Sequence, residues 1–196
     1  MYELNEKELI FVFTGPNGAG RRTVAQMSGS TLGIKQVISY TTRPPRSSEV
    51  DGQDYHFISA EQFSDAEANK AFIEVIEFSG NRYGIKEQDV ADMIQKFGAV
   101  YLVLNRHGAE QLKSTYGNRV VRIFIYADRE TVQQREEARG DSPELIERYM
   151  SHYEEEMAYK DACEHVFENI DLAHTVFDLT KTLDDTYLRR NLLDLD

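Results

Sequence analysis

A short apolar segment followed at once by a glycine-rich run is the feature that most restricts how this chain can fold. Leu9 to Thr14 has the sequence LIFVFT, and GPNGAGRRT follows at residues 15–23. An unbroken apolar run of this length is typical of a strand buried on both faces of a parallel sheet. Glycines let successive backbone N–H groups curve around an anion, and a helix that begins at the last glycine adds positive potential. We therefore predict a central strand, an anion-binding phosphate loop (residues 15–23) and a helix.

The rest of the chain alternates between apolar runs and segments of helical periodicity, which predicts an α/β fold. Further strands are expected in the runs 35–40, 72–78, 100–105 and 120–127. With 196 residues, one domain is the expectation. Short alternating runs broken by glycines and by Pro44-Pro45 predict a small β-rich insert at about 41–85, between core segments 1–40 and 86–196.

Helix boundaries are indicated by local capping signals. Ser59 with Gln62 forms a capping box, and Asp128 can cap a helix that ends before Gly140. Ser142-Pro143 predicts the start of a long acidic helix. The last helix is expected to continue into the C-terminal segment LRRNLLDLD at 188–196.

Charge and cysteine content exclude several classes of function. The chain has 22 Lys plus Arg against 34 Asp plus Glu, a net charge of -12, which disfavours nucleic-acid binding. Clustered arginines in so acidic a chain indicate a local anionic partner. The single cysteine, Cys163, is expected to be a small buried hydrophobe, which fits a reducing compartment. No apolar run is long enough for a membrane span or a secretory signal, so a cytoplasmic protein without membrane contact is expected.

The phosphate loop departs from the usual pattern, in which Lys and then Ser or Thr follow the last glycine. Arg21 and Arg22 stand at these places. Arg21 keeps the charge but presents a planar fork instead of a compact ammonium. Arg22 removes the hydroxyl that would bind Mg²⁺, and Thr23 lies about 100° further round the helix.

Two further segments carry a specific resemblance. The sequence SYTTRPPR at 39–46, followed by EVDGQDYHF at 49–57, resembles the GMP-binding segment of guanylate kinases, and FIE at 72–74 with GNRYG at 80–84 resembles that family's next motif. The resemblance spans Leu9 to about Asn169 and implies a P-loop three-layer fold with a central parallel sheet, a small mixed β-rich GMP-binding subdomain and a helical lid at about 129–148.

The resemblance also implies roles for individual residues. Ser39, Arg43, Arg46, Tyr55 and Tyr83 would form a monophosphate cage, since guanidinium forks and hydroxyls suit phosphate. Glu74 would accept hydrogen bonds from the N1–H and N2–H₂ edge of guanine, with Asn105 also at the base. Arg135, Arg139 and Arg148 would act with Arg21 as the catalytic cations on the donor phosphates, and Asn169 would contact adenine.

Other positions depart from the family pattern. Ile85 stands where the family offers guanine a hydroxyl, and Val103 and Asn105 stand where guanylate kinases resemble one another in having two aspartates. Val103 cannot hold a water molecule of a magnesium ion. The loop between Arg139 and Arg148 is shorter than is usual in the family.

These observations predict a protein that binds GMP or a related guanine nucleotide, with ATP binding left open. Its nominal reaction is ATP plus GMP to ADP plus GDP, weak or lost as in a pseudokinase. Mg²⁺ would come with ATP, and no tightly bound metal site is expected. The alternatives are a guanine-nucleotide sensor, a phospho-ligand module like the guanylate-kinase-like domains of membrane-associated scaffolds, or an enzyme with another acceptor base or a metal held mainly by the nucleotide. A monomer or a homodimer is expected.

Overall fold

A five-stranded parallel sheet forms the centre of the molecule in the computed structural model, which describes residues 2–47, 49–78 and 80–189. Its strand order is β2-β7-β1-β8-β9. The bounds are β1 Leu9–Thr14, β2 Lys35–Gln36, β7 Ala99–Val103, β8 Val120–Tyr126 and β9 His165–Glu168. All the neighbours pair in parallel. The predicted α/β class and the central position of β1 are confirmed.

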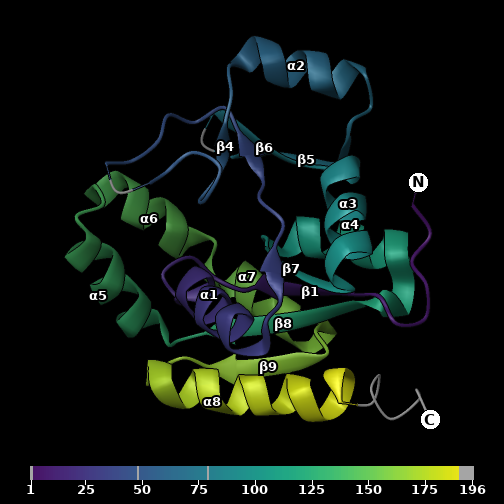
Figure 1. Ribbon diagram of the computed structural model, residues 1–196. Coiled ribbons are helices and arrows are strands. Elements are labelled where there is room, and N and C mark those ends of the chain that lie inside the picture. Colours follow the sequence, from purple (N-terminus) through teal and green to yellow (C-terminus); the bar gives the residue numbers. More distant parts are fainter. Residues whose placement is uncertain (1, 48, 79, 190–196) are drawn as a thin grey trace.

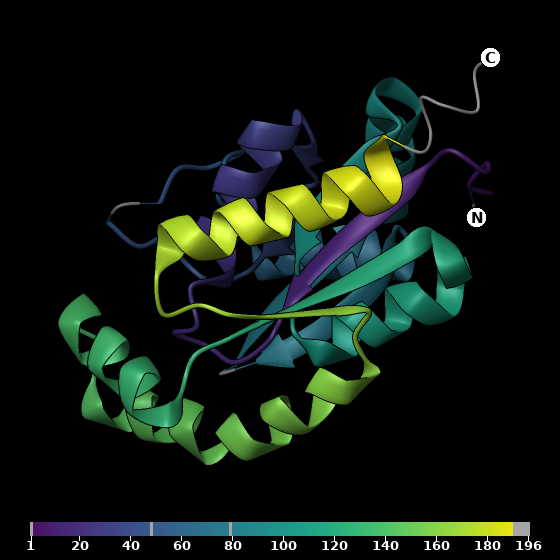
Figure 2. The same ribbon diagram turned by 90° about the horizontal axis from the view of Figure 1, so that it is seen from below.

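Alternate residues of β1 supply two hydrophobic cores, one on each face of the sheet. Phe11 and Phe13 face α1 (Arg21–Leu32) and α8 (Leu172–Leu183). Ile10 and Val12 face α3 (Glu87–Phe97) and α4 (Arg106–Tyr116). Burying each of these side chains contributes about 1.5–3 kcal/mol, so the continuous apolar run requires helices on both sides. Figure 1 shows α8 below the sheet, and Figure 2 shows it running across the sheet beside α1.

A second, four-stranded sheet stands apart from the first, in the order β4-β3-β6-β5. Its strands are β3 Tyr40–Thr41, β4 His56–Phe57, β5 Phe72–Phe78 and β6 Asn81–Lys86. Helix α2 (Ala60–Ala68) covers it at the top of Figure 1, where Phe63 stacks on Phe72 with ring centroids 4.5 Å apart.

The predicted capping signals are confirmed. Ser59 and Gln62 exchange both hydrogen bonds of the capping box at α2. The side chain of Asp128 accepts from Thr131 N at the start of α5 (Arg129–Arg139), and Gly140 ends that helix in the left-handed conformation. Ser142 caps α6 (Pro143–Ser151).

The long acidic helix expected after Pro143 is wrong in its length. Helix α6 ends at Ser151, and the chain continues as α7 (Tyr153–Met157) and the 3₁₀ turn η2 (Ala158–Ala162). Tyr153 is buried and donates to the carbonyl of Ala127 at 2.8 Å, so a tertiary contact redirects the chain there.

Two predicted strands also differ from those in the structure. The run at 35–40 is divided, because β2 pairs with β7 in the large sheet whereas β3 pairs with β6 in the small one. Strand β7 ends at Val103, so Asn105 lies beyond it and caps α4 by accepting from Gly108 N at 3.0 Å.

Two short elements complete the chain, the 3₁₀ turn η1 (Gly117–Arg119) and a π-helical turn η3 (Asp184–Leu188) that follows α8. The predicted continuation of the last helix through 190–196 lies outside the described residues. In the part of the chain that the structure describes, no helix combines the length and the apolar character needed to cross a bilayer.

Candidate nucleotide site

The phosphate loop connects β1 to α1 at the carboxyl edge of the large sheet, and three of its glycines need positive φ angles. Gly15, Gly18 and Gly20 have φ values of 128°, 73° and 85°. A Cβ atom at Gly15 would lie 2.1 Å from the carbonyl oxygen of Ile125, which is backbone and cannot move away. The loop therefore depends on glycine both for its conformation and for its approach to β8. Pro16 and Ala19 are buried, and Asn17 is half-buried.

Arg21, the first residue of α1, is held by acceptors within the protein. Its guanidinium donates to the carbonyl of Leu104 and to Oδ1 of Asn17, both at 2.9 Å. Two of its five N–H groups are thus committed to fixed groups at the loop. The structure places Arg21 at the predicted position but with internal partners that sequence reasoning did not anticipate.

Arg22 reaches from α1 to the loop that precedes β4. Its Nη1 lies 2.8 Å from Oδ1 of Asp54, and its guanidinium carbon lies 4.8 Å from the centre of the Tyr55 ring. Thr23 is exposed. Where the phosphate-loop pattern places a metal-binding hydroxyl, this chain therefore places a cation paired with a carboxylate. Val103 is half-buried and packs against the core, and it offers no ligand either.

Two of the predicted phosphate-binding residues, Arg43 and Tyr83, lie beside the ring of a third, Tyr55. The guanidinium carbon of Arg43 lies 5.5 Å from the centre of Tyr55, and the Tyr83 ring lies 5.9 Å from Tyr55. Ser39 is half-buried, and its carbonyl accepts from His56 N at 2.9 Å. Arg46 has an exposed side chain. The structure thus brings Arg43, Tyr55 and Tyr83 together and adds Arg22 to them.

Glu49 is a member of this cluster that sequence reasoning missed. Its Oε1 lies 2.8 Å from Nη2 of Arg43, and its Oε2 accepts from Arg46 N at 2.8 Å. Burial opposes ionisation, but the hydrogen bond and the charge of Arg43 together hold the pKa of Glu49 below its ordinary value. An acidic residue three positions after Arg46 was the available signal, although such a carboxylate is usually only a solvated loop residue.

Glu74 is buried without a hydrogen-bond donor at one of its oxygens. It is 9% exposed, and Oε1 has no hydrogen-bond partner among the described residues. Burial raises its pKa to about 7. Oε1 faces the start of α4, because a Cβ atom at Gly108 would lie 2.9 Å from it. Asn105 caps the same helix. Ile85 pairs with Glu74 between β5 and β6, and its side chain is 1% exposed and belongs to the core. This arrangement leaves a carboxylate able to accept donors from a ligand.

A chain of contacts links the α5–α6 hairpin (residues 129–151) to the phosphate loop. Arg135 donates to the carbonyl of Asn169 at 2.8 Å, and the Asn169 side chain donates to the carbonyl of Ala19 at 2.8 Å. Asn169 is 4% exposed, so its amide is fixed against the loop. Arg148 lies in the last turn of α6 with an exposed side chain.

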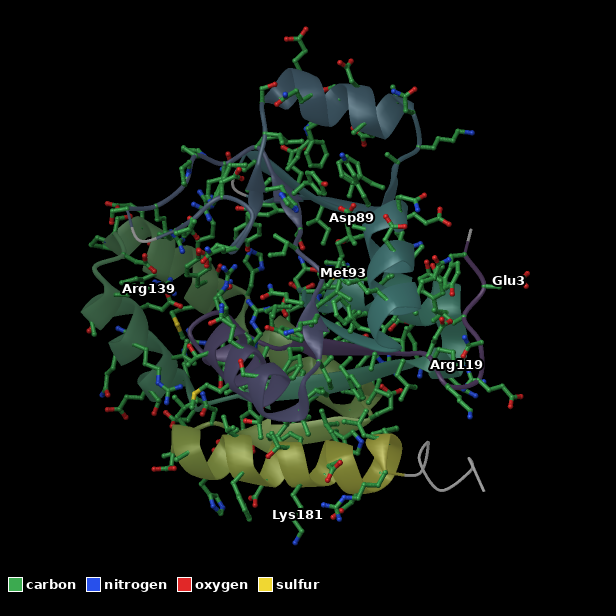
Figure 3. The ribbon with its side chains drawn as sticks, in the orientation of Figure 1. Glu3, Asp89, Met93, Arg119, Arg139 and Lys181 are labelled. Atoms are coloured by element: carbon green, nitrogen blue, oxygen red, sulfur yellow. The ribbon has the colours of Figure 1, made fainter. Side chains whose placement is uncertain are left out.

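Arg139 is paired with two carboxylates, and one of them is buried against the phosphate loop. Figure 3 shows Arg139 on the hairpin. It forms ion pairs with Glu136 and Asp141. Glu136 and Glu137 are neighbours on α5 but differ in burial, since Glu136 is fully buried and Glu137 is exposed. The tertiary position of α5 over the loop causes this difference.

Comparisons with known proteins agree with the fold and with the motifs. The family profile for guanylate kinase matches residues 7–186. The chain is 34% identical over 169 residues to the guanylate kinase of Sphingopyxis alaskensis, which covers 85% of this chain and 77% of that protein. It is 35% identical over 175 residues to the guanylate kinase of Symbiobacterium thermophilum, covering 88% and 83% respectively. The crystal structure of guanylate kinase from Anaplasma phagocytophilum matches with a TM-score of 0.75 and 26% identity, over 92% of this chain and 86% of that chain. This chain belongs to the guanylate kinase family.

Proposed function

We propose that this chain binds GMP at the small sheet. Arg43, Arg46, Tyr55 and Tyr83, with Ser39, hold the phosphate in this proposal, because guanidinium forks and hydroxyls suit phosphate oxygens. The convergence of Arg43 and Tyr83 on the Tyr55 ring supports the assignment. The buried oxygen of Glu74, with Asn105 nearby, suits the N–H edge of guanine, which adenine does not present.

The nominal reaction is transfer of a phosphoryl group from ATP to GMP, giving ADP and GDP, and we propose that this chain performs it weakly or not at all. The ion pair between Arg22 and Asp54 is the observation that carries this proposal, since it puts a cation where a metal ligand is needed. Arg21 and Val103 support it in the same direction. Losing one preorganised donor commonly lowers the rate by about 10²–10³. The side chains at this place do not fit a magnesium ion, so any Mg²⁺ would be held mainly by the nucleotide.

The remaining assignments belong to the same proposal. The segment at about 41–85 is the GMP-binding subdomain and the segment at about 129–148 is the lid of a single domain. Arg135, Arg139 and Arg148 act on the donor phosphates, and Asn169 contacts adenine. The protein is cytoplasmic and is a monomer or a homodimer. The second candidate is a guanine-nucleotide sensor or a phospho-ligand module. It is favoured by Arg22 and Val103, which stand where the family has metal-binding residues.

Calorimetric titration with GMP and with Mg-ATP, followed by a coupled assay of ADP formation, tests the proposal. GMP should bind with a heat that is lost in Arg43→Ala and kept in Arg129→Ala, an exposed arginine at the start of α5. ADP formation should be slow even at high enzyme concentration. Binding of neither nucleotide would refute the GMP site, and turnover equal to that of an active guanylate kinase measured in parallel would refute the loss of activity. GMP binding without Mg-ATP binding would favour the sensor or module.

A further inference from the structure

The carboxylate of Glu136 faces the phosphate loop from helix α5. Its side chain is fully buried, although its neighbour Glu137 is exposed and accepts from Gln133 within α5. A Cβ atom at Gly18 would lie only 2.7 Å from Oε1 of Glu136. An acidic oxygen therefore lies directly against the loop whose backbone is shaped for an anion.

The two oxygens of Glu136 differ in their partners. Oε2 is paired with Arg139, which is also paired with Asp141. Oε1 has no hydrogen-bond partner among the described residues. Glu136 thus keeps Arg139 engaged with protein carboxylates while turning an oxygen without a hydrogen-bond partner among the described residues toward Gly18.

Charged groups on several elements act on this carboxylate. The pKa of Glu136 is raised above its ordinary value, first by burial and then by the contact with Asp141, and Arg139 on the same helix and Arg46 on the loop after β3 offset part of this rise. Tyr149 of α6 is another titratable group that interacts with Glu136. Because the pKa is raised, Glu136 gains its negative charge at a higher pH than an exposed glutamate does.

We propose that Glu136 sets the donor specificity of the phosphate loop by opposing polyphosphate binding in its ionised form. The inference deepens the proposed function, since it assumes that the donor phosphates would lie at this loop. A polyphosphate there meets a like charge at Gly18 and competes with Glu136 for Arg139. The proposed GMP ligands lie at the small sheet, and although Arg46 also acts on this carboxylate, the effect on GMP should be smaller than the effect on ATP.

Glu136→Gln removes the charge at nearly constant shape, and Glu137→Gln is the matched control, because it removes the same charge from the adjacent exposed position. ATP is titrated in EDTA and in Mg²⁺, at pH 6 and at pH 8, with GMP titrated in parallel. We expect Glu136→Gln to bind ATP about tenfold more tightly at pH 8. The reason is that two like charges placed together at a site cost on the order of 1.4 kcal/mol or more. At pH 6 the gain in ATP affinity should shrink, and GMP affinity should change less than ATP affinity at either pH. Comparing variants cancels the titration of the ATP phosphates themselves.

Equal or weaker ATP binding by Glu136→Gln at pH 8, or an equal gain in Glu137→Gln, would overturn the inference. If Glu136 served only to position Arg139, its replacement would weaken ATP binding at both pH values, which is the opposite sign. Glu136→Leu, checked for folding by its thermal transition, provides a second uncharged variant. Absence of GMP binding in every variant would count against the proposed function instead, and the ratio of ATP affinities between variants would still test Glu136.

Discussion

Replacing Glu74 by glutamine should remove a pH dependence from GMP binding. Burial raises the pKa of Glu74 to about 7, so about one carboxyl in ten is ionised at pH 6 and about nine in ten at pH 8. Only the ionised form accepts both N–H groups of guanine without giving up a proton. The affinity for GMP should therefore rise about tenfold between pH 6 and pH 8, or about 1.4 kcal/mol. In Glu74→Gln the contribution from this carboxyl should disappear.

The free energy of unfolding of the ligand-free protein provides a second readout for Glu74. The group ionises near 4.5 when the chain is unfolded and near 7 when it is folded, so stability is lost as the pH rises through this window. The difference corresponds to roughly 3 kcal/mol above pH 7. Urea unfolding should show Glu74→Gln more stable than the unmodified chain at pH 8, with little difference at pH 4.5.

Isothermal titration with GMP and with guanosine checks the predicted pH dependence of binding. The phosphate of GMP ionises near pH 6 and also favours binding at higher pH, whereas guanosine lacks this phosphate. The same change of GMP affinity with pH in both proteins would refute the assignment of guanine to Glu74. So would an equal loss of stability between pH 4.5 and pH 8 in both proteins, since it would place the titration elsewhere.

Three further variants test the remaining contacts. Arg21→Lys with Arg22→Ser should raise the rate of ADP formation by about tenfold or more in a coupled assay, since losing one such group commonly lowers a rate by more than tenfold. An unchanged rate would mean that other departures from the family pattern limit phosphoryl transfer. Asp54→Asn frees Arg22 beside the proposed phosphate cage and should tighten GMP binding a few-fold in calorimetry at low salt. The control Asp65→Asn on α2 should have no effect. Weaker GMP binding by Asp54→Asn would show that the ion pair organises the site. Gly15→Ala should lower the free energy of unfolding, measured in urea, by more than about 2 kcal/mol. Residue 15 has a φ of 128°, and its new Cβ atom would lie 2.1 Å from a backbone oxygen. An unchanged midpoint of the urea transition would contradict the predicted strain.

The elements that could be predicted from the sequence depend on local signals. The central strand before Gly15 was indicated by an unbroken apolar run, and the ends of α5 by Asp128 and Gly140. These signals act within a few residues, so neighbouring segments do not change them. The run at 35–40 was predicted as one strand because periodicity cannot say which sheet a residue joins.

Contacts within the candidate site were less accessible, because they join residues far apart in the chain. The pair formed by Arg22 and Asp54 spans 32 positions. Glu136 lies in a charged segment whose local sequence does not predict burial, and it is buried by the packing of α5 over Gly18. Residue types therefore indicated where phosphate would bind, but not which arginines already have partners.

Three of the arginines at the proposed phosphate sites share one property, which is that each is paired with a carboxylate of the same chain. The pairs are Arg22 with Asp54, Arg43 with Glu49, and Arg139 with Glu136 and Asp141. Phosphate binding at such a site is an exchange of anions, in which the ligand must compete with a carboxylate that is already in place. A ligand gains only the difference between the two pairings, so the acidic residues set the affinity as much as the arginines do. An arginine replaced alone removes the ligand contact and also leaves a partly buried carboxylate unpaired, and replacing the carboxylate as well separates these two effects on binding.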